Sequence, residues 1–117
     1  MKTKLSSLSR NSEFKSLLNG KKISNKYLTI FFKKFSDKSN KNLNISFVAK
    51  KKLGNAVKRN RTKRRLRNIM TQILKISKIN LNYSYLLIAK QNIIDAKFSE
   101  IKAVVFKDYK KIKWQKF

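Results

Sequence analysis

The sequence has no cysteine, no histidine and no proline, and only two glycines among its 117 residues. Without cysteine or histidine, the chain cannot form disulfides, thiol nucleophiles, Cys/His zinc sites or histidine acid–base catalysts. No apolar run reaches the roughly 18 residues of a membrane span. Residues 1–10 lack the apolar stretch and small-residue cleavage site of a secretory signal. We therefore expect a cytoplasmic protein with no membrane partner.

Acidic residues are also scarce: five, against 31 lysines and arginines, which gives a formal net charge of +26. The five acidic residues are scattered along the chain: Glu13, Asp37, Asp95, Glu100 and Asp108. A metal-dependent nuclease site needs converging carboxylates, so we expect no catalytic residue in the chain. Such an excess of positive charge opposes compaction, and nucleic acid is the simplest polyanionic partner to relieve it. The apolar fraction of 41% predicts one globular domain at 11–117, preceded by a flexible basic tail at 1–10.

What the sequence does have is an uneven distribution of arginine. Five of its six arginines fall within residues 59–67, whereas the remaining positive charge is almost all lysine. The abundance of Lys, Asn and Ile is typical of an AT-rich genome, which favours lysine wherever either residue will do. Arginine persists where a planar guanidinium is needed for bidentate phosphate contacts or base stacking. The cluster therefore predicts a phosphate-recognition site.

The hydrophobic pattern predicts three helices and at least three strands in the order α-β-β-α-β-α, possibly with one more strand. Helices are expected at 11–19, 56–76 and 95–114, and strands at 27–35, 43–50 and 83–90. The first two strands are expected to form a hairpin, and Gly20 to cap the first helix. These elements predict an α+β fold built as a two-layer sandwich.

The helix predicted at 56–76 has two distinct faces at 100° per residue. One is an apolar stripe made by Leu66, Ile69, Met70 and Ile73. The opposite face carries Asn60, Arg64 and Arg67, with Arg61 beside them. This helix should therefore bury one face in the core and present guanidiniums on the other.

Residues 47–67 closely resemble the signature of the bacterial ribonuclease P protein subunit. In that family a strand ends in a Lys-Lys-x-Gly-x-Ala-Val turn and leads into a helix with an Arg-Asn-Arg motif and further basic residues. The residues that fit are Lys51, Lys52, Gly54, Ala56, Val57, Arg59, Asn60, Arg61, Lys63, Arg64 and Arg67. The likeness extends to Phe14, Gly20, 27–32 and 86–90. Leu18 and Ser46 depart from it, where the family often has an aromatic residue and a glycine.

The resemblance implies the protein subunit of an endoribonuclease that removes the 5′ leader from precursor tRNA. In this holoenzyme the RNA subunit carries the catalytic magnesium ions, and the protein alone is not catalytic. It also implies that the helix at 56–76 joins two parallel strands by a left-handed crossover, against the usual right-handed rule.

Two surfaces follow from this resemblance. The first would bind the RNA subunit, with basic side chains neutralising its phosphates. Its residues are Lys51, Lys52, Arg59, Asn60, Arg61, Lys63, Arg64 and Arg67. Of these, Asn60 could also meet a metal-bound water. The leader would lie on the sheet face opposite the core, where aromatic rings can stack on bases, against Phe14, Thr29 and Phe31. Core packing is an equally good explanation of the two phenylalanines.

Two other classes of protein share some of these features. A structural RNA-binding protein of the ribosomal type would have the same charge, size and lack of catalytic residues. A DNA-binding helix usually follows a short helix and turn, and none precedes Ala56, so no DNA partner is expected. The RNA that co-purifies with the protein would distinguish these alternatives.

Overall fold

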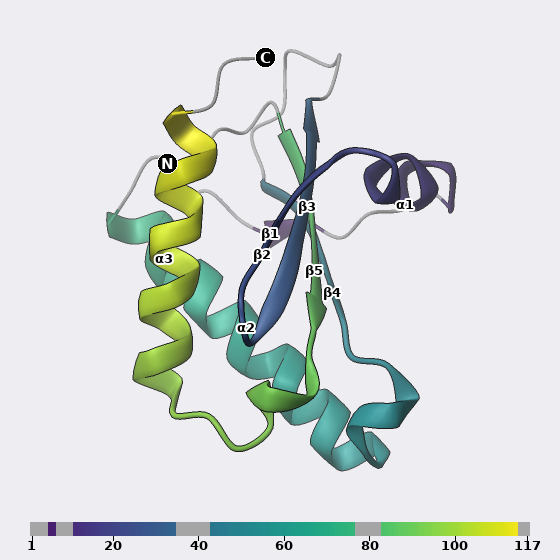
Figure 1. Cartoon of the computed structure of the whole chain (residues 1–117), viewed down its shortest axis with the longest axis vertical. Coiled ribbons are helices and arrows are strands. Elements are labelled where there is room, and N and C mark those ends of the chain that lie inside the picture. Colours follow the sequence, from purple (N-terminus) through teal and green to yellow (C-terminus); the bar gives the residue numbers. More distant parts are fainter. Residues whose placement is uncertain (1–4, 7–10, 35–42, 77–82, 115–117) are drawn as a thin grey trace.

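The computed structural model describes residues 5–6, 11–34, 43–76 and 83–114, with side chains described within 15–33, 45–75 and 83–111 (Figure 1). Its elements run in the order β1 (Leu5–Ser6), α1 (Asn11–Leu18), β2 (Lys21–Ser24), β3 (Leu28–Lys34), β4 (Leu43–Val48), the short 3₁₀ helix η1 (Lys51–Leu53), α2 (Ala56–Ile76), β5 (Tyr83–Ala89), η2 (Gln91–Ile93) and α3 (Phe98–Trp114). The predicted α+β class is confirmed. Two strands are additional to the three that the sequence predicts. Strand β2 corresponds to the possible further strand, and β1 is one more.

Strand pairing concerns both the predicted tail and the predicted hairpin. Within residues 1–10, Leu5–Ser6 forms β1 beside β4, and the rest of that segment lies outside the described residues. The sheet order is β1-β4-β5-β3-β2, so the predicted hairpin between 27–35 and 43–50 is wrong. Strand β5 lies between them, antiparallel to β3 and parallel to β4. The reason is burial: six of the seven residues of β5 are buried, which suits a central strand covered on both faces.

Helices α2 and α3 pack on one face of the sheet and enclose the main core (Figure 1). The predicted stripe of α2 is confirmed, since Leu66, Ile69, Met70 and Ile73 are at most 1% exposed. Across from it lie alternate residues of the strands, including Leu28, Ile30, Phe32, Ile45, Tyr85 and Leu87. Helix α2 joins the parallel strands β4 and β5, and the left-handedness of that connection stays a prediction. No helix in the described part of the chain is long and apolar enough to cross a membrane.

Helix α1 covers one end of the other sheet face (Figure 1). Leu17 on α1 and Leu86 on β5 are both buried outside the main core, and Lys33 Nζ donates a 2.6 Å hydrogen bond to Ser16 Oγ. Gly20 follows the helix as predicted, but its φ is not positive. A Cβ at this position would lie 2.9 Å from the Phe32 carbonyl oxygen. Glycine is needed here because two backbones approach closely, and not because the cap is left-handed.

Candidate nucleic-acid interface

A tight turn positions the basic residues that follow β4. Gly54 has a φ of 132°, a conformation that favours glycine. The Asn55 Oδ1 atom accepts a 2.9 Å hydrogen bond from the Lys58 backbone N–H and so caps α2. Leu53 is buried and anchors η1 in the core. The exposed side chains of Lys51 and Lys52 are therefore held beside the first turn of α2, whose positive end adds to their field.

The outward side of α2 is basic along its first three turns. We define the α2 basic face as the exposed residues Asn60, Arg61, Arg64 and Arg67. The other two predicted RNA contacts on this helix, Arg59 and Lys63, are half-buried. Among the described residues, Arg59 Nε is buried without a hydrogen-bond partner. The structure thus brings all eight predicted RNA contacts together on η1 and α2, with six of them exposed to solvent. Their binding role stays a prediction.

Arg67 has an aromatic neighbour on the sheet. Its guanidinium carbon lies 5.9 Å from the centre of the Phe47 ring on β4. Phe47 is half-buried and packs against the main core. A cation over a ring face is attracted by the ring quadrupole. Phe47 therefore helps to hold Arg67 in place beside β4.

Arg65 differs from the other clustered arginines, and it was not among the predicted RNA contacts. Its Nη2 atom donates a 2.5 Å hydrogen bond to the carbonyl oxygen of Ala96, just before α3. Desolvation by partial burial, together with the nearby charge of Arg61, lowers the pKa of Arg65. The arginine cluster therefore has two uses, because one of its guanidiniums is bound inside the protein.

The sheet face away from α2 and α3 carries the predicted leader residues. Thr29 and Phe31 alternate with the buried Leu28, Ile30 and Phe32 and are half-buried on this side. Their paired residues on the neighbouring strand β5 are Ile88 and Leu86, respectively. We call the partly exposed surface around Thr29, Phe31 and Ile88 the open face. Thr29 and Phe31 thus lie on the sheet face opposite the main core, and their contact with a leader stays a prediction. Phe14 belongs to α1, but its side chain lies outside the described side chains.

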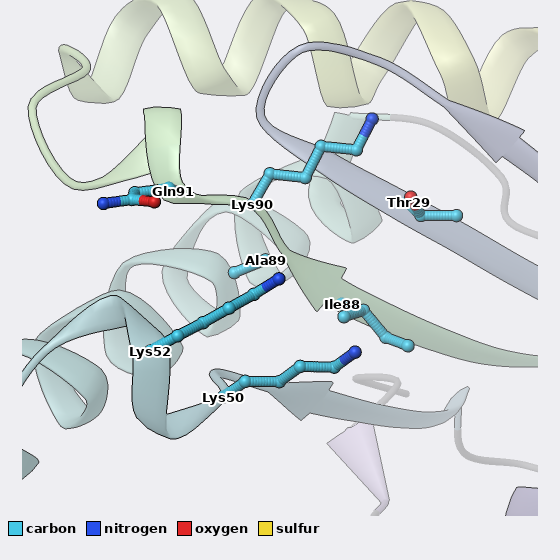
Figure 2. Close-up of a pocket in the computed structure, with 7 residues that line it drawn as sticks. All are labelled: Thr29, Lys50, Lys52, Ile88, Ala89, Lys90 and Gln91. Carbon is cyan, nitrogen blue, oxygen red and sulfur yellow. The ribbon is translucent and has the colours of Figure 1, made fainter.

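A pocket of about 240 Å³ lies at one end of the open face, with three lysines around an apolar floor (Figure 2). It is lined by Thr29, Lys50, Lys52, Ile88, Ala89, Lys90 and Gln91. Lys50 and Lys52 extend towards the end of β5 (Figure 2). The Lys90 Nζ atom donates hydrogen bonds of 2.5 Å to Ser24 Oγ and 2.6 Å to the Asn25 carbonyl oxygen.

Five of these lining residues were not among the predicted contacts: Lys50, Ile88, Ala89, Lys90 and Gln91. The run of three lysines at 50–52 was a signal for Lys50. The placement of Lys90 and Gln91 beside Thr29 required the pairing of β3 with β5, because these residues are about 60 positions from Thr29 in the sequence.

Comparisons with known proteins cover nearly the whole chain. A family model described as Ribonuclease P matches residues 2–113. The ribonuclease P protein component of Fusobacterium nucleatum is 37% identical over 102 residues, covering 83% of this chain and 87% of that one. The corresponding protein of Mesomycoplasma hyopneumoniae strain 7448 is 33% identical over 111 residues, covering 94% and 95%.

Solved structures show the same fold. The Thermotoga maritima ribonuclease P protein has a TM-score of 0.76 at 21% identity, covering 91% of this chain and 96% of that one. The Staphylococcus aureus ribonuclease P protein has a TM-score of 0.72 at 25% identity, covering 92% and 94%. The basic turn and helix described above lie within the matched region. This chain therefore belongs to the ribonuclease P protein family, whose members act with an RNA partner in the tRNA-processing ribonucleoprotein endoribonuclease.

Proposed function

We propose that the chain binds the catalytic RNA subunit through η1 and the α2 basic face, and binds the 5′ leader of precursor tRNA on its open face. It would thereby assist RNA-catalysed, magnesium-dependent removal of the leader in the cytoplasm. The observation that carries this proposal is the position of η1. Lys52 lines the pocket of the open face, while α2 begins four residues later with its guanidiniums on the outer side of the core. The two surfaces thus meet at one short turn.

The α2 basic face has the chemistry for RNA phosphates. Its three exposed guanidiniums present planar forks that match phosphate geometry, and each neutralised phosphate releases counterions from the RNA. The exposed Asn60 amide on the same face offers both a donor and an acceptor. A helix with this surface binds RNA in a strongly salt-dependent manner.

The open face has the chemistry for a single strand. Proteins that hold single-stranded nucleic acid without regard to sequence combine an aromatic surface with a positive groove along the backbone. Here the half-buried ring of Phe31 and the hydroxyl of Thr29 lie on the same face as the lysine-lined pocket. A base of the leader would stack on the Phe31 ring, and the leader phosphates would contact Lys50 and Lys52 in the pocket.

Magnesium is proposed to be bound mainly by the RNA subunit. The described residues contain no group of three or more His, Cys, Asp or Glu side chains that could hold a metal ion. Helices η1 and α2 include no carboxylate side chain, and carboxylates are the usual protein ligands of magnesium. We therefore derive no step of the reaction from a protein-bound metal. A contact of Asn60 with a metal-bound water is the one role proposed for this chain near the ion.

Phe31→Ala in the reconstituted holoenzyme tests the leader surface. Losing one stacked base costs about 1–3 kcal/mol, so precursor tRNA should bind roughly 5- to 150-fold more weakly, whereas mature tRNA should bind as before. Phe106→Ala is the matched control, because Phe106 is also a half-buried phenylalanine but lies on α3, on the core side of the sheet. Equal weakening of precursor and mature tRNA by Phe31→Ala would mean that the leader does not lie on the open face.

A further inference from the structure

Arg65 is a clustered arginine that the proposed RNA contacts do not use. Its guanidinium reaches from α2 to the segment before α3 and donates to the Ala96 carbonyl oxygen at 2.5 Å. The side chain is half-buried, whereas Arg61 and Arg64 on the same helix are exposed. The Ala96 carbonyl oxygen engages one of the five N–H donors of Arg65 and fixes the guanidinium against the segment before α3. The contact is therefore part of the fold.

The segment that Arg65 holds leads to the pocket of the open face. Ala96 N donates to the Ile93 carbonyl oxygen at 3.3 Å, and Ile93 N donates to the Lys90 carbonyl oxygen at 3.0 Å. Ile93 is 2% exposed and fixes η2 in the core. Lys90 N in turn donates to the Tyr27 carbonyl oxygen at 2.8 Å. Successive hydrogen bonds thus connect the Arg65 guanidinium with Lys90, which lines the pocket.

We propose that Arg65 is a positioning residue that sets the pocket of the open face relative to the α2 basic face, through the segment 90–96. This proposal rests on the proposed function, in which the pocket holds the leader and the basic face holds the RNA subunit. The leader must reach the RNA-borne reaction centre while both partners are bound, so the geometry between the two surfaces matters for precursor binding. Arg65 would control that geometry without contacting either RNA.

Arg65→Met, Arg65→Lys and Arg64→Met distinguish this role from an RNA contact. Methionine keeps much of the volume but removes the donor, whereas lysine keeps a donor and the charge. In holoenzyme with Arg65→Met, the preference for precursor over mature tRNA should fall on the order of tenfold, because misplacing a binding group by about 1 Å can cost as much as 10²-fold. Arg65→Lys should recover part of this preference.

The salt dependence of RNA-subunit binding provides the contrasting measurement. Arg65→Met should leave the logarithmic salt slope unchanged, while Arg64→Met should make it shallower by about 0.7–0.9, the value for one phosphate, and keep the precursor preference. A shallower slope for Arg65→Met would show that Arg65 contacts RNA and would overturn the proposal. An unchanged precursor preference would also overturn it. Loss of the proposed function has a different signature, namely a Phe31→Ala variant that does not discriminate between precursor and mature tRNA.

Hydrogen exchange of the protein alone gives a test that does not depend on holoenzyme assembly. In Arg65→Met the amides of Ile93 and Ala96 should exchange at least about tenfold faster, because the segment loses the contact that holds it to α2. The amide of Ile30 in the core of β3 should keep its protection. Equal protection of Ile93 and Ala96 in the variant and the parent protein would overturn the proposal.

Discussion

Removing two exposed guanidiniums of the α2 basic face, in Arg64→Ala/Arg67→Ala, tests whether that face meets phosphates of the RNA subunit. Each phosphate contact contributes about 0.7–0.9 to the slope of log K against log salt concentration. The double variant should therefore have a slope shallower by about 1.4–1.8. When salt rises from about 50 to 200 mM, affinity for the RNA subunit should decrease for both proteins, and the factor of decrease should be roughly tenfold smaller for the double variant.

The same substitutions should leave the fold intact. Both side chains are exposed, opposite the buried Leu66 and Ile73. Among the described residues, the folded-state contact that is lost is that of Arg67 with the Phe47 ring, which is worth about 0.5–1 kcal/mol. A loss of that size lowers the melting temperature by only a few degrees, on the scale of about 4–8 °C per kcal/mol for a small domain.

The assay is RNA-subunit binding over a series of salt concentrations, with thermal melts of the free protein alongside. Lys107→Ala/Lys111→Ala is the control, because it removes the same charge from exposed positions on α3. If this control makes the slope equally shallow, the net charge of +26 governs binding and the arginine cluster is not a specific phosphate site. A parent-like slope in the arginine variant would also refute the assignment.

Three further outcomes are expected. The isolated protein, stripped of RNA by nuclease treatment, should not cleave precursor tRNA. A mature 5′ end from protein alone would refute the proposal that the RNA subunit is catalytic and the protein only binds. Sulfate should raise the melting temperature more than chloride at matched ionic strength, because it binds the folded state; an equal effect would mean that the free protein has no anion site. Among the described residues the Tyr109 hydroxyl is buried without a hydrogen-bond partner, and burial, with a contribution from Tyr85, raises the pKa of Tyr109 well above 10.0. Tyr109→Phe should therefore add about 1 kcal/mol of stability. It should also reduce the loss of stability above pH about 10, where the unfolded chain ionises first, as measured by melts from pH 8 to 11.

The parts of the fold that the sequence predicts are those with a strong local pattern. Helix α2 was predicted at 56–76 and observed at Ala56–Ile76, because its apolar stripe repeats over several turns and a glycine turn precedes it. Strand β2, with the sequence Lys-Lys-Ile-Ser, has a single apolar residue and no alternation to find. The error in the hairpin arose because β3 and β4 are neighbours in sequence but each pairs with the distant β5.

The same division applies to the candidate site. The residues on η1 and α2 are contiguous in the sequence, so their grouping could be predicted from spacing alone. The face of Phe31 was not decided by the sequence, because core packing explained this residue equally well, and the structure places Phe31 between the buried Ile30 and Phe32. The hydrogen bond from Arg65 to Ala96 spans 31 positions, and the contact of Lys90 with Ser24 spans 66. Such contacts depend on the tertiary arrangement of elements, which propensities and periodicity do not encode.

The central place of β5 has a consequence for synthesis of the protein on the ribosome. Translation produces residues 1–76 first, including the whole of α2, yet the inner edges of β3 and β4 have no partner until Tyr83–Ala89 is made. Until then the apolar stripe of α2 has no completed sheet to cover it, and two strand edges are open to pairing with other chains. The domain should therefore close in one late, cooperative step. A nascent chain arrested before residue 83 should remain sensitive to protease, and like-charge repulsion between such chains would limit their association.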